Sequence, residues 1–164
     1  MKKIMIALWC LMGAYLSAQS QQEGDTIRAK LAAVLQERRY ISAAVMGFVN
    51  ADGKQSALGS YFSEVSRDYL SKTKGLQLVE RSQINQLEYE WDLSASGLIA
   101  EDHVIALGNL LSADVLILGT MTRVGRRIAI TIRAVDTKTG VVVSAGSSEL
   151  TGAKYLRMYN DILE

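Results

Sequence analysis

The sequence predicts a single α/β domain in which helices flank a mixed sheet of about five strands, and the sheet ends in an antiparallel meander. Three observations predict this class. Residues 41–111 alternate between strand-like and helix-like patterns, which is typical of a sheet covered by helices. Residues 113–150 contain three strand-like runs joined by two short turns. Apolar residues make up 49% of the 164 residues, which is enough for one hydrophobic core.

Residues 1–18 have the three-part pattern of a secretory signal peptide. Lys2 and Lys3 form a positive head, residues 4–16 carry no charge, and small residues follow them. As a helix the uncharged part is roughly 20 Å long, too short to cross about 30 Å of hydrocarbon. We expect cleavage after Ala18, with cleavage after Ser20 as the alternative. The mature protein is then exported, periplasmic or associated with the outer membrane, without a transmembrane segment.

Cys10, the single cysteine, bears on whether the protein is lipidated. A lipid-modified cysteine should follow the whole apolar segment, with small residues just before it. Cys10 instead lies inside that segment and follows the bulky Trp9. We therefore expect a mature chain with no cysteine, and hence with no disulfide and no thiol chemistry.

Residues 19–40 are expected to be a polar segment followed by a helix over residues 26–39, which has one apolar stripe opposite its charged residues. Residues 41–49 are expected to form a buried strand. The loop after that strand contains Gly53, but it lacks the spacings of the glycine-rich phosphate-binding motifs. Gly53 is therefore interpreted as a turn residue.

Residues 56–74 are expected to form an amphipathic helix that is capped by Ser56 and followed by Gly75. Its expected apolar stripe consists of five residues: Leu58, Tyr61, Phe62, Val65 and Tyr69. After it, the pattern predicts a short strand over residues 76–79, a helix that is capped by Ser82 and runs through Trp91, and a helix over residues 102–111. Gly108 inside the last helix suggests a close approach to the sheet, since glycine otherwise weakens a helix.

The meander begins with a continuously apolar strand at residues 115–118 and continues with strict alternation over residues 128–135. The β-branched run 141–143 opens its third strand. Between the last two strands, Asp136 can close a turn with its side chain, and Gly140 can adopt the positive φ that a short turn needs. Residues 151–164 are expected to be a C-terminal tail.

The charge balance argues against a nucleic-acid-binding protein. Without Lys2 and Lys3, 16 basic side chains face 17 acidic ones, so the net charge is −1. Nucleic-acid-binding proteins carry a clustered basic excess. The arginine pairs at 38–39 and 126–127 are isolated.

The sequence offers few groups for catalysis. His103 is the single histidine, and its acidic neighbours at the start of a helix indicate a solvated position. No metal-ligand spacing and no nucleophile elbow is present. Glu80 and Arg81 at a strand end could be an active pair, or a salt bridge or cap that fixes the turn between strand and helix. We predict that the protein is not an enzyme and has no cofactor or metal.

Several motifs, taken in order, resemble the CsgG/FlgO-like superfamily of bacterial envelope proteins. They are VER at residues 79–81, a helix that ends in Ser96-Gly97, ALGNLLSADVLILG at 106–119 and RAVDTKTGVVV at 133–143. The resemblance covers residues 41–150. The family-motif residues, which we interpret as structural, are Glu80, Arg81, Gly97, Gly108, Gly119, Asp136 and Gly140.

This superfamily includes the curli secretion channel, flagellar outer-membrane accessory proteins and lipoprotein activators of penicillin-binding proteins. The sequence departs from the channel, because the connection at residues 124–127 is too short for a membrane hairpin and the chain ends soon after the last strand. The resemblance therefore implies a periplasmic domain without the pore hairpins.

The resemblance implies a non-catalytic envelope module that binds other proteins or helps them assemble, accessory to a secretion, flagellar or cell-wall machine. Two alternatives stay open: a self-assembling structural ring and a carrier of a small ligand. We expect an envelope protein partner, self-association or both. The small, polar run at residues 144–148 suggests that the edge of the last hairpin accepts a strand from another chain.

Overall fold

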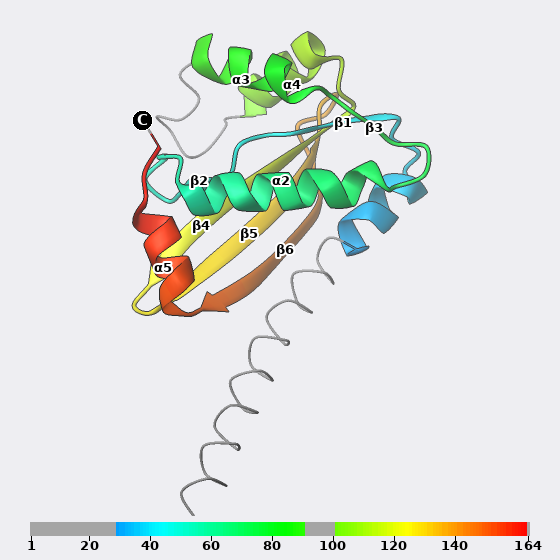
Figure 1. Ribbon diagram of the computed structural model, residues 1–164. Coiled ribbons are helices and arrows are strands. Elements are labelled where there is room, and N and C mark those ends of the chain that lie inside the picture. The colour runs from blue at the N-terminus through cyan, green and yellow to red at the C-terminus, as the bar shows by residue number, and fades with distance from the viewer. Residues whose placement is uncertain (1–28, 91–100, 164) are drawn as a thin grey trace, which may run out of the picture.

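The computed structural model describes residues 29–90 and 101–163 and has the expected α/β class, with one mixed sheet of six strands (Figure 1). The strands are β1 (Ser42–Val45), β2 (Val49–Asn50), β3 (Gln77–Leu78), β4 (Val115–Val124), β5 (Arg127–Asp136) and β6 (Val142–Thr151). The helices are α2 (Ala57–Ser71), α3 (Arg81–Glu90), α4 (Glu101–Leu111) and α5 (Ala153–Asn160). Residues 29–37 are also helical and are called the N-terminal helix below.

Some predictions fall outside the described residues. They are the signal peptide over residues 1–18, its cleavage site, the fate of Cys10, and the roles of Trp91 and Gly97. These stay predictions.

The sheet has the strand order β3-β1-β4-β5-β6, with β2 paired to β4 beside this path. Strand β1 runs parallel to both β3 and β4, whereas β4, β5 and β6 are antiparallel. The antiparallel meander predicted from the sequence is therefore confirmed. Its first turn has two residues between the paired Val124 and Arg127, which agrees with the short connection inferred from the sequence.

Helices cover both faces of the sheet and divide the core into two clusters. The N-terminal helix, α2 and α5 lie on one face, where Leu35 and Leu58 pack against residues such as Ile117. On the other face α3 and α4 bring Ile84 and Leu107 to the opposite side of β1 and β4. The alternation predicted for β5 is confirmed, because the residues on its inward face are buried: Ile128, Ile130, Ile132 and Ala134.

The apolar stripe predicted for α2 is partly wrong. Ser56 does cap the helix, since its hydroxyl accepts a hydrogen bond from the Gly59 amide at 3.3 Å. The buried residues, however, are Leu58, Gly59, Ser63, Ser66 and Leu70, whereas Tyr61 is 49% exposed. Small residues face inward because α2 lies very close to the sheet: a Cβ on Gly59 would stand 2.1 Å from the Phe48 carbonyl oxygen.

The strand predicted over residues 41–49 is interrupted. Residues 46–48 separate β1 from β2, although both strands pair with β4. The break coincides with a contact to α3, because the Gly47 amide donates to the Glu88 carboxylate at 2.7 Å. The start of α3 also differs from the prediction: the helix begins at Arg81, so Ser82 lies inside it and is not its cap.

The C-terminal segment, predicted simply as a tail, contains α5 and is fastened to the start of α2. The Ala57 amide donates to the Asp161 carbonyl at 2.8 Å, and the Leu163 amide donates to the Gln55 carbonyl at 3.0 Å. The buried Asn50 side chain donates to the Tyr159 carbonyl at 3.2 Å. Residues 153–163 are thus an integral part of the domain.

Candidate functional site

A polar cleft lies at the carboxyl ends of the parallel strands β1 and β3, between α2 and α3. Open α/β sheets bind ligands at this kind of edge. The cleft is lined mainly by polar and charged side chains: Gln55, Ser60, Ser63, Glu64, Arg67, Arg81, Asn85 and Glu88. Its volume is about 20 Å³, the space of a single water molecule.

Glu88 is the most buried carboxylate in contact with this cleft. It accepts a hydrogen bond from the Gly47 amide at 2.7 Å. Burial raises the pKa of Glu88 above its usual value, and the bonds from Gly47 and Gln55 oppose this rise only in part. A buried carboxylate with a raised pKa is a candidate proton donor or acceptor. In this structure the Glu88 carboxylate accepts a hydrogen bond from the backbone at the break between β1 and β2.

Arg67 of α2 binds the carbonyl groups at the ends of two strands. Its guanidinium donates to the Val79 carbonyl at 2.8 Å and to the Val45 carbonyl at 3.1 Å. Its Nε lies 4.0 Å from the Glu64 carboxylate, at the limit of an ion pair, and has no hydrogen-bond partner in the described structure. The side chain therefore fastens β1, β3 and α2 together.

The predicted pair Glu80 and Arg81 lies beside this cleft, but the two side chains do not pair with each other. Arg81 forms an ion pair with Glu64 of α2. The Glu80 carbonyl accepts hydrogen bonds from the Gln83 and Ile84 amides, which begin α3. Both residues thus fix the turn from β3 into α3 and its position against α2.

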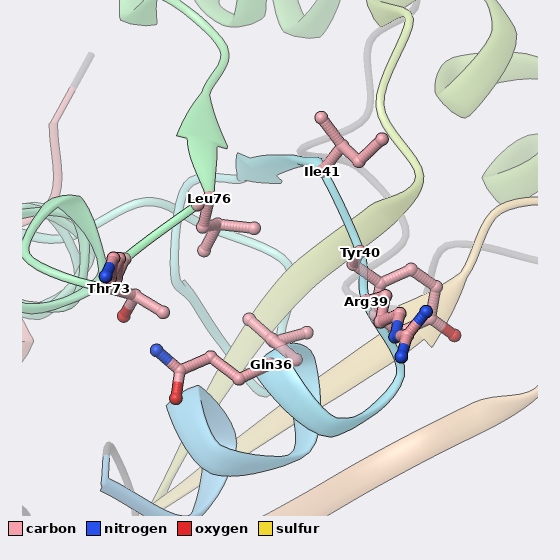
Figure 2. Close-up of a pocket in the computed structure, with 9 residues that line it drawn as sticks. Gln36, Arg39, Tyr40, Ile41, Thr73 and Leu76 are labelled. Carbon is pink, nitrogen blue, oxygen red and sulfur yellow. The ribbon is translucent and has the colours of Figure 1, made fainter.

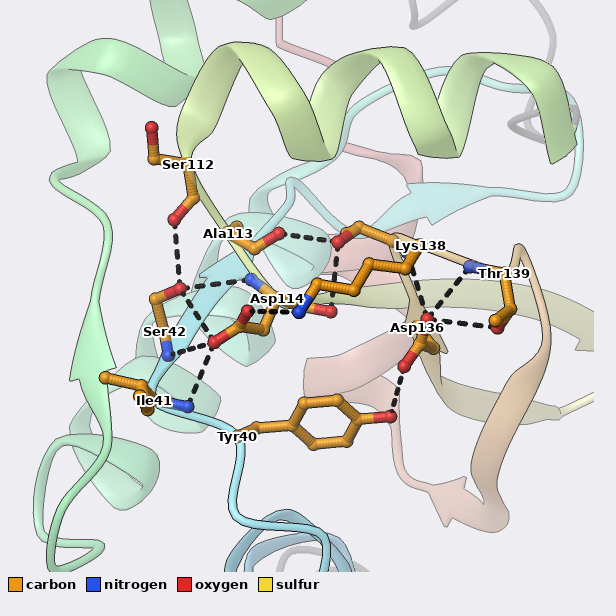
Figure 3. A network of polar contacts seen from close by, with 10 residues as sticks. Tyr40, Ile41, Ser42, Ser112, Ala113, Asp114, Asp136, Lys138 and Thr139 are labelled. Carbon is orange, nitrogen blue, oxygen red and sulfur yellow. Dashed lines mark hydrogen bonds and ion pairs between the residues drawn. The ribbon is translucent and has the colours of Figure 1, made fainter.

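A second polar network contains Asp136 and lies at the opposite end of β1 (Figure 3). Asp114 accepts hydrogen bonds from the amides of Ile41 and Ser42 at 3.0 and 3.1 Å. Lys138 lies 3.5 Å from the other Asp114 oxygen. Burial alone would raise the pKa of Asp114, but these partners lower it below its usual value. The network joins the start of β1 to the turn between β5 and β6.

Asp136 closes that turn in the way its sequence predicts. One carboxylate oxygen accepts hydrogen bonds from the Lys138 and Thr139 amides, both at 2.9 Å. Its other oxygen accepts a bond from the Tyr40 phenol at 2.6 Å. Burial opposes ionisation of Asp136, yet these bonds hold its pKa below the usual value. Gly140 has the expected positive φ, of 69°.

Gly108 and Gly119 are sites of close packing. A Cβ on Gly108 would stand 2.2 Å from the Thr137 Cβ, so α4 approaches the turn between β5 and β6. A Cβ on Gly119 would stand 2.2 Å from the Phe48 ring. Each family-motif residue in the described structure thus has a contact or a backbone conformation within the fold, and their interpretation as structural residues stays a prediction. Glu80, Arg81 and Gly119 lie toward one end of the parallel strands, and Gly108, Asp136 and Gly140 toward the other.

Sequence reasoning missed Arg67, Glu88 and Asp114. A signal for Arg67 was present, because it lies three residues before Leu70 and four after Ser63, on the inner side of α2. No comparable signal identifies Glu88, whose partner Gly47 is 41 residues away.

The described residues offer little reactive chemistry. His103 lies exposed on α4, as expected from the sequence. Within residues 29–90 and 101–163, no group of three or more histidine, cysteine, aspartate or glutamate side chains is arranged to hold a metal ion. None of the helices in this part of the chain is long and apolar enough to span a bilayer.

The outer edge of β6 is the candidate binding surface. Strand β6 is ten residues long and, among the described strands, pairs with β5 alone. Residues 141–148 carry neither charge nor proline, although charges and prolines commonly protect such edges. We call the backbone of residues 144–148 on this open side the β6 edge. A groove of about 160 Å³ separates it from Lys30 and Leu31 of the N-terminal helix.

Comparisons with solved structures identify the same fold in LpoB. The LpoB C-terminal domain from Escherichia coli has a TM-score of 0.57 and 14% identity, over 77% of this chain and 96% of that one. The LpoB C-terminal domain from Salmonella enterica has a TM-score of 0.51 and 13% identity, over 68% and 82%. The NMR structure of E. coli LpoB has a TM-score of 0.58 and 14% identity, over 76% of this chain and 65% of that one.

Sequence comparisons identify a protein family but no curated relative. No curated protein sequence matches the chain. The family described as FlgO protein matches residues 24–154, which is most of the chain. This match supports the FlgO part of the resemblance seen in the sequence, whereas the CsgG part stays a prediction. The chain belongs to the FlgO protein family.

Proposed function

We propose that this chain is an exported, non-catalytic accessory protein of the cell envelope, and that it works by binding another envelope protein through the β6 edge. Its family membership and its signal-like N-terminus support the location. The fold shared with the LpoB C-terminal domains is compatible with it. The machine it serves is one for secretion, for the flagellum or for cell-wall synthesis.

The open β6 edge is the observation that carries this proposal. An unpaired strand presents a row of backbone donors and acceptors, and an extended segment can add to it as a further strand. Alternate side chains on the outer face, Ala145 and Ser147, are small and exposed, so they leave space for a partner. By contrast, the charged groups in the two polar networks are already bound within the fold.

Substitutions in β6 test the proposal. Ala145→Pro removes an amide donor that points away from β5 and adds a bulky ring, and Ser147→Arg adds a charge to the exposed face. Thr122→Arg is the control, because Thr122 is exposed on β4, where it pairs with Ala129 of β5. We expect both β6 variants to lose their envelope partner in affinity capture from cells, while the control retains it. Unchanged capture by folded β6 variants would refute the role of this edge.

Self-assembly is the alternative that the same edge supports. Residues 141–148 are uncharged, so the edges of two copies would not repel each other. Light scattering after size exclusion would then detect oligomers that grow with protein concentration and are abolished by Ala145→Pro. Carriage of a small ligand is a further alternative, and calorimetry against nucleotides and cell-wall fragments tests it.

A further inference from the structure

An open cleft of about 380 Å³ lies at the end of the domain opposite the polar cleft, where the N-terminal helix and α2 both end. Figure 2 shows Gln36 extending from the N-terminal helix toward the end of α2, with Arg39 and Tyr40 on the opposite side. Thr73, Lys74 and Leu76 complete the side formed by α2 and β3. The volume is in the range of cavities that bind small ligands or individual side chains.

The cleft combines positive charge with apolar surface. Arg39 and Lys74 line it, and neither side chain forms an ion pair within the described residues. Ile41, which is 63% exposed, supplies most of the apolar surface, and Leu76, which is 9% exposed, adds to it. A ligand that fits must therefore present a negative group next to an aliphatic one.

Arg39 occupies a backbone position that favours glycine. The Tyr40 amide donates to the Leu35 carbonyl at 3.1 Å, and the Arg39 amide donates to the Gln36 carbonyl at 3.0 Å. This pattern ends a helix with one left-handed residue, which is usually glycine. Arg39 fills that position with φ of 56°. This conformation at a non-glycine residue supports the hypothesis of a functional role for Arg39.

Arg39 and Lys74 have a simpler explanation, since cations near helix C-termini complement the partial negative charge of the helix. That explanation does not require the cations to line a cleft, nor does it account for Ile41 beside it. Lys72 shows the simpler case, because it lies at the same end of α2 but pairs with Asp68 at 2.7 Å and does not line the cleft.

We propose that this cleft binds an acidic peptide segment in which an aspartate or glutamate adjoins an aliphatic residue. The inference rests on the proposed function, because the segment would belong to the envelope partner. A peptide suits the site better than a membrane surface does, because side chains can enter the cleft of about 380 Å³ between the two helix ends. Arg39 binds the carboxylate, Lys74 on the other side of the cleft adds positive charge, and Ile41 and Leu76 contact the aliphatic side chain.

Titration of isotope-labelled protein with short capped peptides tests the proposal by NMR. The probes are three pentapeptides with leucines around a central aspartate, asparagine or lysine. The aspartate peptide is expected to give saturable shifts at the amides of Thr73 and Gly75. The asparagine peptide should bind about tenfold more weakly, as expected when a hydrogen bond between charged groups is lost, and the lysine peptide should not bind.

Two variants separate binding from folding. Arg39→Gly removes the guanidinium but suits the positive φ, so the protein should stay folded and lose about tenfold in affinity for the aspartate peptide. Lys74→Gln should have a similar effect, whereas Lys72→Gln, which removes the same charge nearby, should leave affinity unchanged. Equal effects of Lys72→Gln and Lys74→Gln would overturn the proposal, because the attraction would then be long-range.

Other outcomes also overturn it. Absence of shifts with the aspartate peptide, or equal binding of all three peptides, contradicts an acidic-segment site. Binding to phosphatidylglycerol vesicles without binding to the peptide would assign the surface to the membrane instead. Ala145→Pro should not affect the titration. A failed titration with intact partner capture through β6 would therefore refute this inference and leave the proposed function standing.

Discussion

Tyr40 donates a hydrogen bond of 2.6 Å to Asp136, across 96 residues of sequence. The bond joins the segment after the N-terminal helix to the turn between β5 and β6, and so it links the two ends of the domain's sequence (Figure 3). We expect Tyr40→Phe to lower the free energy of unfolding by about 1 kcal/mol, the usual contribution of one partly exposed hydrogen bond. Urea denaturation measures the change, and Tyr61→Phe, on an exposed face of α2, is the control.

The same bond predicts a pH dependence at alkaline pH. Burial and the bond to Asp136 raise the pKa of Tyr40 to about 12. Because the pKa in the folded state lies above the unfolded value of about 10, the protonated phenol stabilises the fold below pH 10, and this contribution is lost as the pH rises toward 12. The stability difference between wild type and Tyr40→Phe should therefore shrink over this range. A difference that stays constant would contradict the shift.

We also expect Glu88 to make the free energy of unfolding depend on pH in the acid range. Burial raises its pKa in the folded state, so the protonated form favours folding, and its contribution is lost as the pH rises through the folded-state pKa. Glu88→Gln keeps an oxygen that can accept the Gly47 bond. We expect this variant to be at least as stable as wild type at pH 7 and to lose that advantage near pH 4. A variant that is less stable at pH 7 would show that the ionised carboxylate is stabilising.

Arg67 should contribute more to stability than an exposed cation on the same helix. Arg67→Met keeps much of the aliphatic stem but leaves the Val45 and Val79 carbonyls without their donor. We expect a loss of about 2 kcal/mol in unfolding free energy, as for buried groups that lose a charged partner. The matched change Lys72→Met breaks an exposed ion pair and should cost less than about 1 kcal/mol.

A substitution at Gly119 tests its close contact with Phe48. Gly119→Ala places a methyl group where the Phe48 ring now lies, and overpacking of this kind costs about 1–3 kcal/mol. Phe48→Leu in the same chain should recover part of that loss, because the smaller side chain makes room. Thermal unfolding of the two single variants and the double variant forms the cycle. Strict additivity of the two losses would exclude the contact as the cause.

The antiparallel half of the domain could be predicted from the sequence because its signals are local. Alternation placed Ile128 and Ile130 on the inner face of β5, and both are at most 2% exposed. Asp136 and Gly140 identified the turn through chemistry within five residues. These signals need no knowledge of the rest of the chain.

The parallel half was less predictable because its packing depends on distant partners. The inner side of α2 contains Ser63 and Ser66, which hydropathy alone would place outside. They are buried because α2 lies close to the sheet. The break in the strand predicted over residues 41–49 depends on Glu88, which is far from Gly47 in sequence. The cleft beside Arg39 likewise forms where two helix ends meet in space.

Site-specific photo-crosslinking in living cells tests the central claim most directly, with the crosslinker at Ser147 on β6 and, as a control, at Thr122 on β4. Mass spectrometry then identifies both the linked protein and the N-terminus of the mature chain. We predict that Ser147, and not Thr122, links to a different envelope protein, and that the mature chain begins after Ala18 or Ser20. Equal links from both positions, or a chain that still begins at Met1, would contradict an exported accessory protein that binds through β6.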